Sequence, residues 1–231
     1  MKSSARFAGL LYLLSALPNV FSYIYLPKAM IVPGDAAATA RRITDALPTY
    51  RMGILCDLLG QVLFIWVVLS LYNLLKDVDK RYARLMVTLV AVGVAVQIAN
   101  VFNLMAPLIL LSGADFLSPF TKPQLDALVL GFLTLRGDAI FVSQVFWGLW
   151  LFPFGVLVIR SGFFPKFLGV LLIVACVAYV NDSFANLVMP AWAHIADQLV
   201  QVFGSLGEVS MLLWLIIMGA KEPPKESPAL P

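Results

Sequence analysis

Residues 50–75 read YRMGILCDLLGQVLFIWVVLSLYNLL, and this stretch decides the fold class. A helix rises about 1.5 Å per residue, so a bilayer core of about 30 Å needs roughly 20 apolar residues, and this run exceeds that length. Its polar groups are unevenly placed, because Asp57 and Gln61 stand in the first half. The second half carries no charge and no amide before the edge residue Asn73. The stretch therefore predicts a membrane-spanning helix with one polar half.

Five further stretches have the same character, and we predict that each also spans a membrane. They cover residues 6–26, 82–111, 139–159, 166–189 and 199–220. Hydrophobic residues make up 61% of the chain and charged residues 13%, whereas soluble domains carry about 25% charged residues. The sequence thus predicts an all-α polytopic membrane protein with six transmembrane helices in a single domain, residues 1–220. Residues 221–231 are charged and rich in proline, and predict a disordered cytoplasmic tail.

The Lys and Arg residues predict the orientation of the bundle. With the N-terminus in the cytoplasm, the inner segments hold ten of the sixteen basic residues, namely Lys2, Arg6, Lys76, Lys80, Arg81, Arg84, Arg160, Lys166, Lys221 and Lys225. The positive-inside rule therefore places both termini in the cytoplasm. The basic residues are scattered over short loops rather than gathered in one patch. We accordingly expect the lipid bilayer, and not nucleic acid, as the partner of this chain.

Two extramembrane helices are indicated by their capping residues. Asp35 is a good N-cap, and the apolar residues that follow it recur at helical spacing, so a short amphipathic helix is expected in the first outer loop. Thr121 and Gln124 form a capping-box pattern before the fourth span. A single helix over residues 124–159 would be about 54 Å long, longer than the bilayer core. We expect it to tilt, to project outward or to break near Gly137.

Polar side chains gather in the outer half of every predicted span. Hydrocarbon penalises such groups, so they are expected to face protein or water rather than lipid. This asymmetry predicts an outward-facing polar cavity above a sealed inner half. The candidate ligand-binding residues are Glu208, Gln201, Asp197, Asp182, Asn186, Asn100, Asn103, Gln97, Asp57, Arg51, Arg136, Asp138 and Gln144.

The last span contains the sharpest pattern. Asp197, Gln201, Ser205 and Glu208 follow one another at spacings of four, four and three, which predicts one polar stripe on one helix face. Glu208 would be the deepest member, near the bilayer centre, where an ionised carboxylate is costly unless it is paired. Two interpretations stay open. Glu208 is either a proton-coupling acid or ligand contact at the cavity floor, or a hydrogen-bonding anchor between helices.

The amides of the third span have an equally local pattern. Gln97, Asn100 and Asn103 recur every three residues, and hydrogen bonding between helices is the commoner role of such a series. In the fifth span Asp182 and Asn186 share a face, and a carboxylate beside amides is also compatible with a bound cation. Neither pattern alone selects a ligand.

Two arginines stand at the height of the polar half. Arg51 opens the second span and Arg136 precedes the fourth, so either could pair with a buried carboxylate or bind an anionic ligand. For Arg136 we favour a structural ion pair. The tryptophans need no ligand to explain them, and most are expected to pack between helices.

Several functional classes are disfavoured by composition. The chain contains one histidine, so a multi-histidine metal site cannot be built, and we expect neither a metal nor a cofactor. The apolar inner half argues against a fixed hydrophilic pore. An outward-facing receptor, sensor or accessory protein that binds a small polar molecule or a lipid headgroup is the leading hypothesis. A secondary transporter or proton-coupled carrier, a carboxylate-dependent intramembrane enzyme and a purely structural bundle stay open, as does a homo-oligomeric state.

Several short stretches resemble a known family. They are residues 33–40 (PGDAAATA), 72–76 (YNLLK), 148–155 (GLWLFPFG), 160–169 (RSGFFPKFLG), and the pair 207–208 with Trp214. In these the chain resembles DUF4386, a bacterial membrane family of unknown function. The resemblance implies six helices and a location in the bacterial cytoplasmic (inner) membrane. It implies no activity.

Overall fold

The computed structural model describes residues 1–221, and this part of the chain is helical apart from short connections. The elements are α1 (Lys2–Val20), η1 (Phe21–Tyr25), α2 (Leu26–Met30), α3 (Ala36–Asp45), α4 (Leu47–Leu75), α5 (Lys80–Leu110), η2 (Asp115–Leu117), α6 (Lys122–Leu149), α7 (Leu151–Ser161), α8 (Lys166–Val188), α9 (Pro190–Leu199), η3 (Val200–Gly204) and α10 (Ser205–Ile217). They form 6 continuous stretches long and apolar enough to cross a membrane. The predicted all-α fold with six spans is confirmed. The predicted tail lies outside the described residues, apart from Lys221.

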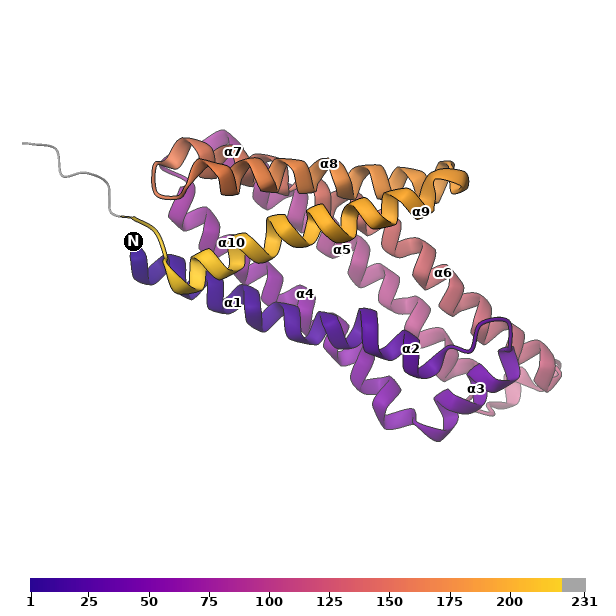
Figure 1. The fold of residues 1–231 in the computed structure, drawn as a ribbon. Coiled ribbons are helices and arrows are strands. Elements are labelled where there is room, and N and C mark those ends of the chain that lie inside the picture. The colour runs from indigo at the N-terminus through magenta and orange to yellow at the C-terminus, as the bar shows by residue number, and fades with distance from the viewer. Residues whose placement is uncertain (222–231) are drawn as a thin grey trace, which may run out of the picture.

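The six stretches form an elongated bundle whose first and last helices start and finish at the same end (Figure 1). The guanidinium of Arg6 in α1 donates to the backbone carbonyl of Ile217 in α10 at 2.7 Å. Helices α2 and α3 lie at the opposite end, beside the first turns of α6. The end at which α1 begins and α10 finishes is called the inner end, in accordance with the orientation predicted from the basic residues.

The longest stretch runs from Lys122 to Ser161 and measures about 60 Å at the helical rise. The predicted capping box of Thr121 and Gln124 is present at its start. The structure contradicts the break considered near Gly137, because α6 runs through that residue and the interruption falls at Trp150. Pro153 explains the position, since it lacks the N–H that would bond to the carbonyl of residue 149. The first part of α6 instead projects beyond α8 and α9 (Figure 1).

The inner half of the bundle is closed by an apolar core. It includes Leu71, Met86, Phe154, Leu157 and Leu215, all fully buried. The buried charged side chains of residues 1–221 are Asp57, Asp126, Arg136 and Asp182, and they are not part of this core. The structure therefore agrees with the apolar inner half expected from the sequence.

The first outer loop contains the expected short helix, α3. Its N-cap is Asp35, whose carboxylate accepts from the backbone N–H of Ala38 at 2.8 Å. Ile43 is fully buried in a second apolar cluster with Tyr50, whose hydroxyl donates to the carbonyl of Leu104 at 2.9 Å. This cluster fixes the outer ends of α4, α5 and α6 against one another.

Candidate functional site

A cavity of about 260 Å³ lies between α1, α4, α6, α8 and α10. Its lining includes the carboxylate of Glu208 and an unusual share of aromatic rings; the lining residues are Tyr12, Ser15, Ala16, Asn19, Val20, Tyr23, Ile24, Gln61, Phe64, Trp147, Trp150, Tyr179 and Glu208. Along α1 and η1 the cavity reaches from Tyr12 to Ile24, which corresponds to about 18 Å at the α-helical rise. Its inner end meets the apolar core, because Tyr12 and Trp150 belong to both.

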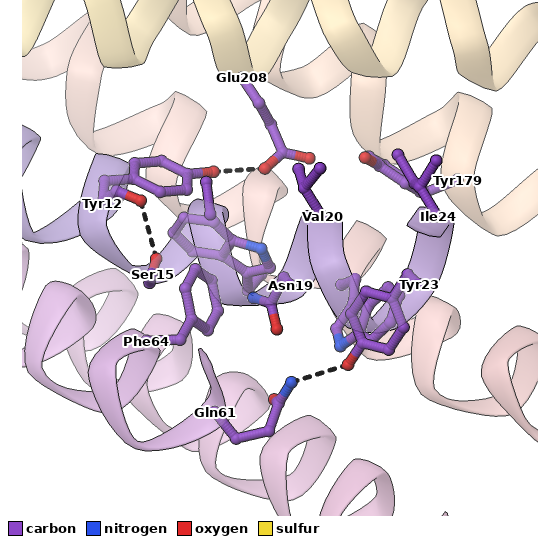
Figure 2. A pocket seen from close by; sticks show the side chains of 13 residues that line it. Tyr12, Ser15, Asn19, Val20, Tyr23, Ile24, Gln61, Phe64, Tyr179 and Glu208 are labelled. Carbon is purple, nitrogen blue, oxygen red and sulfur yellow. Dashed lines mark hydrogen bonds between the residues drawn. The ribbon is translucent and has the colours of Figure 1, made fainter. Parts of the chain in front are cut away.

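Glu208 projects from α10 into this cavity between two phenols (Figure 2). The hydroxyl of Tyr12 donates a hydrogen bond to one of its carboxylate oxygens. The hydroxyl of Tyr179, from α8, points toward the other oxygen (Figure 2). Among residues 1–221 no Lys, Arg or His forms an ion pair with Glu208. Its carboxyl group therefore has hydroxyl partners but no cationic partner in the described part of the chain.

A second carboxylate, Asp57, lies in a fully buried ion pair. The guanidinium of Arg136 approaches it at 2.7 Å, and the two side chains are 4% and 0% exposed. Tyr23 donates to Asp57 at 3.0 Å, and the amide of Gln97 donates at 3.3 Å. Asn100 adds a hydrogen bond to the Arg136 carbonyl at 3.1 Å. This network joins η1, α4, α5 and α6, and it confirms the expected ion pair of Arg136 and the bonding between helices for Gln97 and Asn100. Asn103 instead donates to Asn100 on its own helix at 2.9 Å.

A third polar cluster surrounds Asp182 on α8. Gln144 on α6 donates to its carboxylate at 2.6 Å, and Asn186 donates to the other oxygen at 3.0 Å. Asp197 of α9 lies beside it as a second carboxyl group. No group of three or more His, Cys, Asp or Glu side chains in the described residues could hold a metal ion.

Tyrosines connect the cavity to both polar clusters. The amide of Gln61 donates to the hydroxyl of Tyr23 at 2.9 Å (Figure 2), and that hydroxyl also donates to Asp57. On the other side, the backbone carbonyl of Tyr179 accepts from Gln144 at 3.4 Å. The cavity walls are therefore held by hydrogen-bonded networks that reach into the surrounding helices.

The structure divides the candidate residues into four groups. Glu208 alone lines the cavity; Asp57, Arg136, Gln97, Asn100 and Asn103 belong to the buried ion-pair network; Asp182, Asn186, Gln144 and Asp197 form the third cluster; Arg51, Asp138 and Gln201 are exposed. The outer polar groups thus do not converge on one site.

The polar stripe expected along the last span is not formed. Gln201 and Ser205 are exposed, whereas Glu208 faces the cavity. The π-helical turn η3 contributes to this, because its i→i+5 bonds insert an extra residue and rotate Glu208 by about 100° relative to Asp197, which precedes the turn. The spacing of four, four and three assumed a regular α-helix, so it predicted the wrong face.

The aromatic lining was not predicted from the sequence, where most of the tryptophans were expected to pack between helices. Trp147 and Trp150 both line the cavity. A signal was present on the first span, because Tyr12, Asn19 and Tyr23 follow at spacings of seven and four and so share one helix face. A face with two phenols and an amide in an apolar helix marks a surface that is turned away from lipid.

Fold and site together define a polytopic helical membrane protein with a carboxylate-bearing cavity between its spans. The model of the family described as "Domain of unknown function (DUF4386)" matches residues 7–219, and the chain belongs to this family. An uncharacterized protein of Archaeoglobus fulgidus is 32% identical over 80 residues, which cover 35% of this chain and 46% of that protein. The match thus spans about half the length of the archaeal relative. No solved structure matches the chain significantly.

Proposed function

We propose that this protein is a receptor, sensor or accessory protein of the bacterial cytoplasmic membrane, with both termini in the cytoplasm. Its cavity takes up a small amphipathic molecule from the outer side. The observation that carries the proposal is the cavity itself, with Glu208 at its inner end and half-exposed Val20 and Ile24 at its rim. A carboxylate is costly to bury in a membrane, and that of Glu208 faces this cavity rather than packing against another helix.

The shape of the bundle supports entry from the outer side. Helices α1 and α10 lie together at the inner end and diverge toward α2 and α9 (Figure 1). The cavity begins where they separate. Glu208 is nine residues from the inner end of α10, so it lies about 14 Å from that end, near the middle of a bilayer core. Within residues 1–221, the apolar core lies between Glu208 and the inner end.

Cysteine labelling tests this proposal and separates it from transport. In a variant with Cys56→Ala and Cys176→Ala, Ala16 in the cavity wall is changed to Cys and exposed to a charged, membrane-impermeant maleimide. We expect labelling in right-side-out vesicles and none in inside-out vesicles. The matched control is Ala8→Cys, two turns earlier on α1 and fully buried, which should stay unlabelled in both.

The other outcomes each contradict the proposal. Labelling of Ala16→Cys from both sides would indicate alternating access and hence a carrier. Labelling from the inner side alone would reverse the orientation. Absence of labelling from both sides, in a variant that keeps the melting temperature of its parent, would identify a structural bundle.

A further inference from the structure

We propose that the cavity selects an organic cation, an ammonium or trimethylammonium group carried on a short apolar chain. This inference rests on the proposed function, because it names the ligand class of the same cavity. It is carried by the position of one uncompensated carboxylate among aromatic rings.

The carboxylates of Asp57 and Glu208 differ in their partners. Asp57 is neutralised by Arg136 and accepts further hydrogen bonds, so it requires no cation from a ligand. Glu208 accepts from Tyr12 but meets no basic side chain among residues 1–221. In a surrounding of low polarity, a carboxylate is stabilised by a cation within a few ångströms. The cavity supplies the space in which such a cation could sit.

The walls of the cavity suit a cation that is poorly hydrated. The rings of Tyr23, Phe64, Trp147 and Tyr179 are half-buried and line the cavity, and the ring of Trp150 packs edge-on to Phe64 at 5.3 Å. Aromatic faces attract cations, and several rings around one site are the usual recognition device for quaternary ammonium groups. The same rings offer a favourable surface to an alkyl chain.

Other ligand classes find fewer partners. Among residues 1–221 no Lys, Arg or His lines the cavity, so a phosphate or sulfate group would meet the carboxyl group of Glu208 without a basic partner. The polar groups that a sugar would need are partly engaged, because Ser15 donates to the Tyr12 carbonyl and Gln61 donates to Tyr23. The volume of about 260 Å³ lies just below the usual range of small-molecule sites, roughly 300–1,000 Å³, and so favours a small headgroup with a short chain.

Protection of Ala16→Cys from the maleimide measures this selectivity. The protein is placed in phosphatidylglycerol nanodiscs and titrated with hexyltrimethylammonium, hexanol or hexyl sulfate, which differ in charge but share the chain. We expect hexyltrimethylammonium to protect at concentrations at least about tenfold lower than hexanol, a difference of about 1.4 kcal/mol. Hexyl sulfate should protect more weakly than hexanol.

Two variants test whether the carboxylate and the aromatic rings cause the preference for hexyltrimethylammonium over hexanol. Glu208→Gln should bring hexyltrimethylammonium to within about threefold of hexanol, whereas the matched change Asp138→Asn, at an exposed carboxylate of α6, should leave the preference intact. Trp147→Leu keeps the carboxylate, and should weaken protection by hexyltrimethylammonium at least about threefold more than it weakens protection by hexanol. Protection by hexanol in each variant shows that the cavity has formed.

Lipid composition identifies the source of the cation. If the amine of phosphatidylethanolamine is the natural occupant, nanodiscs that contain this lipid should raise the concentration of hexyltrimethylammonium needed for protection. If a free amine is the occupant, the concentration should not change. The inference is overturned if hexanol protects as well as hexyltrimethylammonium, and this result would leave the outward cavity standing. If the maleimide fails to label Ala16→Cys, the result would instead contradict the proposed outward-facing cavity.

Discussion

Replacement of Arg136 by Met is expected to lower the free energy of unfolding by about 3–5 kcal/mol. The change leaves the carboxylate of Asp57 fully buried without its cation, while methionine fills much of the same volume. It also removes the hydrogen bond at 3.0 Å to the Ser22 hydroxyl and the guanidinium that lies 5.4 Å from the Tyr23 ring centre. Unfolding by sodium dodecyl sulfate in mixed micelles measures the loss.

Two further variants make this prediction specific to a buried charge. The double change Asp57→Leu with Arg136→Met removes both charges and should restore most of the stability, because a buried ion pair contributes little beyond an apolar pair of similar volume. The control is Arg160→Met, which breaks a more exposed pair with Asp79 at 2.8 Å and should cost no more than about 1 kcal/mol. Equal losses from Arg136→Met and Arg160→Met would contradict a buried ion pair.

The fold was largely predictable because its determinants are local. An apolar run such as residues 50–75 is long enough to cross a bilayer, and lipid enforces a helix wherever such a run occurs. The starts of α3 and α6 were predicted for a similar reason, since Asp35 and Thr121 act on backbone groups within three residues. The break after α6 was misplaced, because Pro153 acts on a carbonyl four residues earlier and no other part of the helix marks that point.

The candidate site was harder to predict because it depends on which helix faces meet. In the sequence, several carboxylates are predicted at the same membrane depth as Arg136. Only the packing of α6 against η1 and α4 selects Asp57 as its partner. Glu208 was found because a carboxylate in an apolar span is conspicuous by itself. Its phenolic partners come from other spans, α1 and α8, so no spacing rule within one helix connects them. The π-turn η3 then displaced Gln201 from the face that a regular helix would give it.

Replacement of Gly155 by Ala is the second large expected loss, about 1–3 kcal/mol of unfolding free energy. Helices α7 and α8 meet backbone to backbone at this residue, since an added Cβ would lie 2.6 Å from the carbonyl oxygen of Gly169. A backbone oxygen in a helix cannot move aside as a side chain would, so α7 and α8 must separate. The separation opens the apolar core around Phe154 and Leu168, which both helices share. Thermal unfolding in nanodiscs would measure the loss.

The control for this prediction is Gly131→Ala in α6, where an added Cβ meets nothing within 4 Å. That change should leave the stability unchanged or raise it by up to about 1 kcal/mol, because alanine favours the helix over glycine. A loss at Gly155 with no loss at Gly131 isolates the helix contact from any general effect of the substitution. Gly155→Ala combined with Gly169→Ala should cost less than the sum of the two single changes, because both act on one contact and the helices need to separate only once. Additive losses would instead mean that the two glycines do not face each other across α7 and α8.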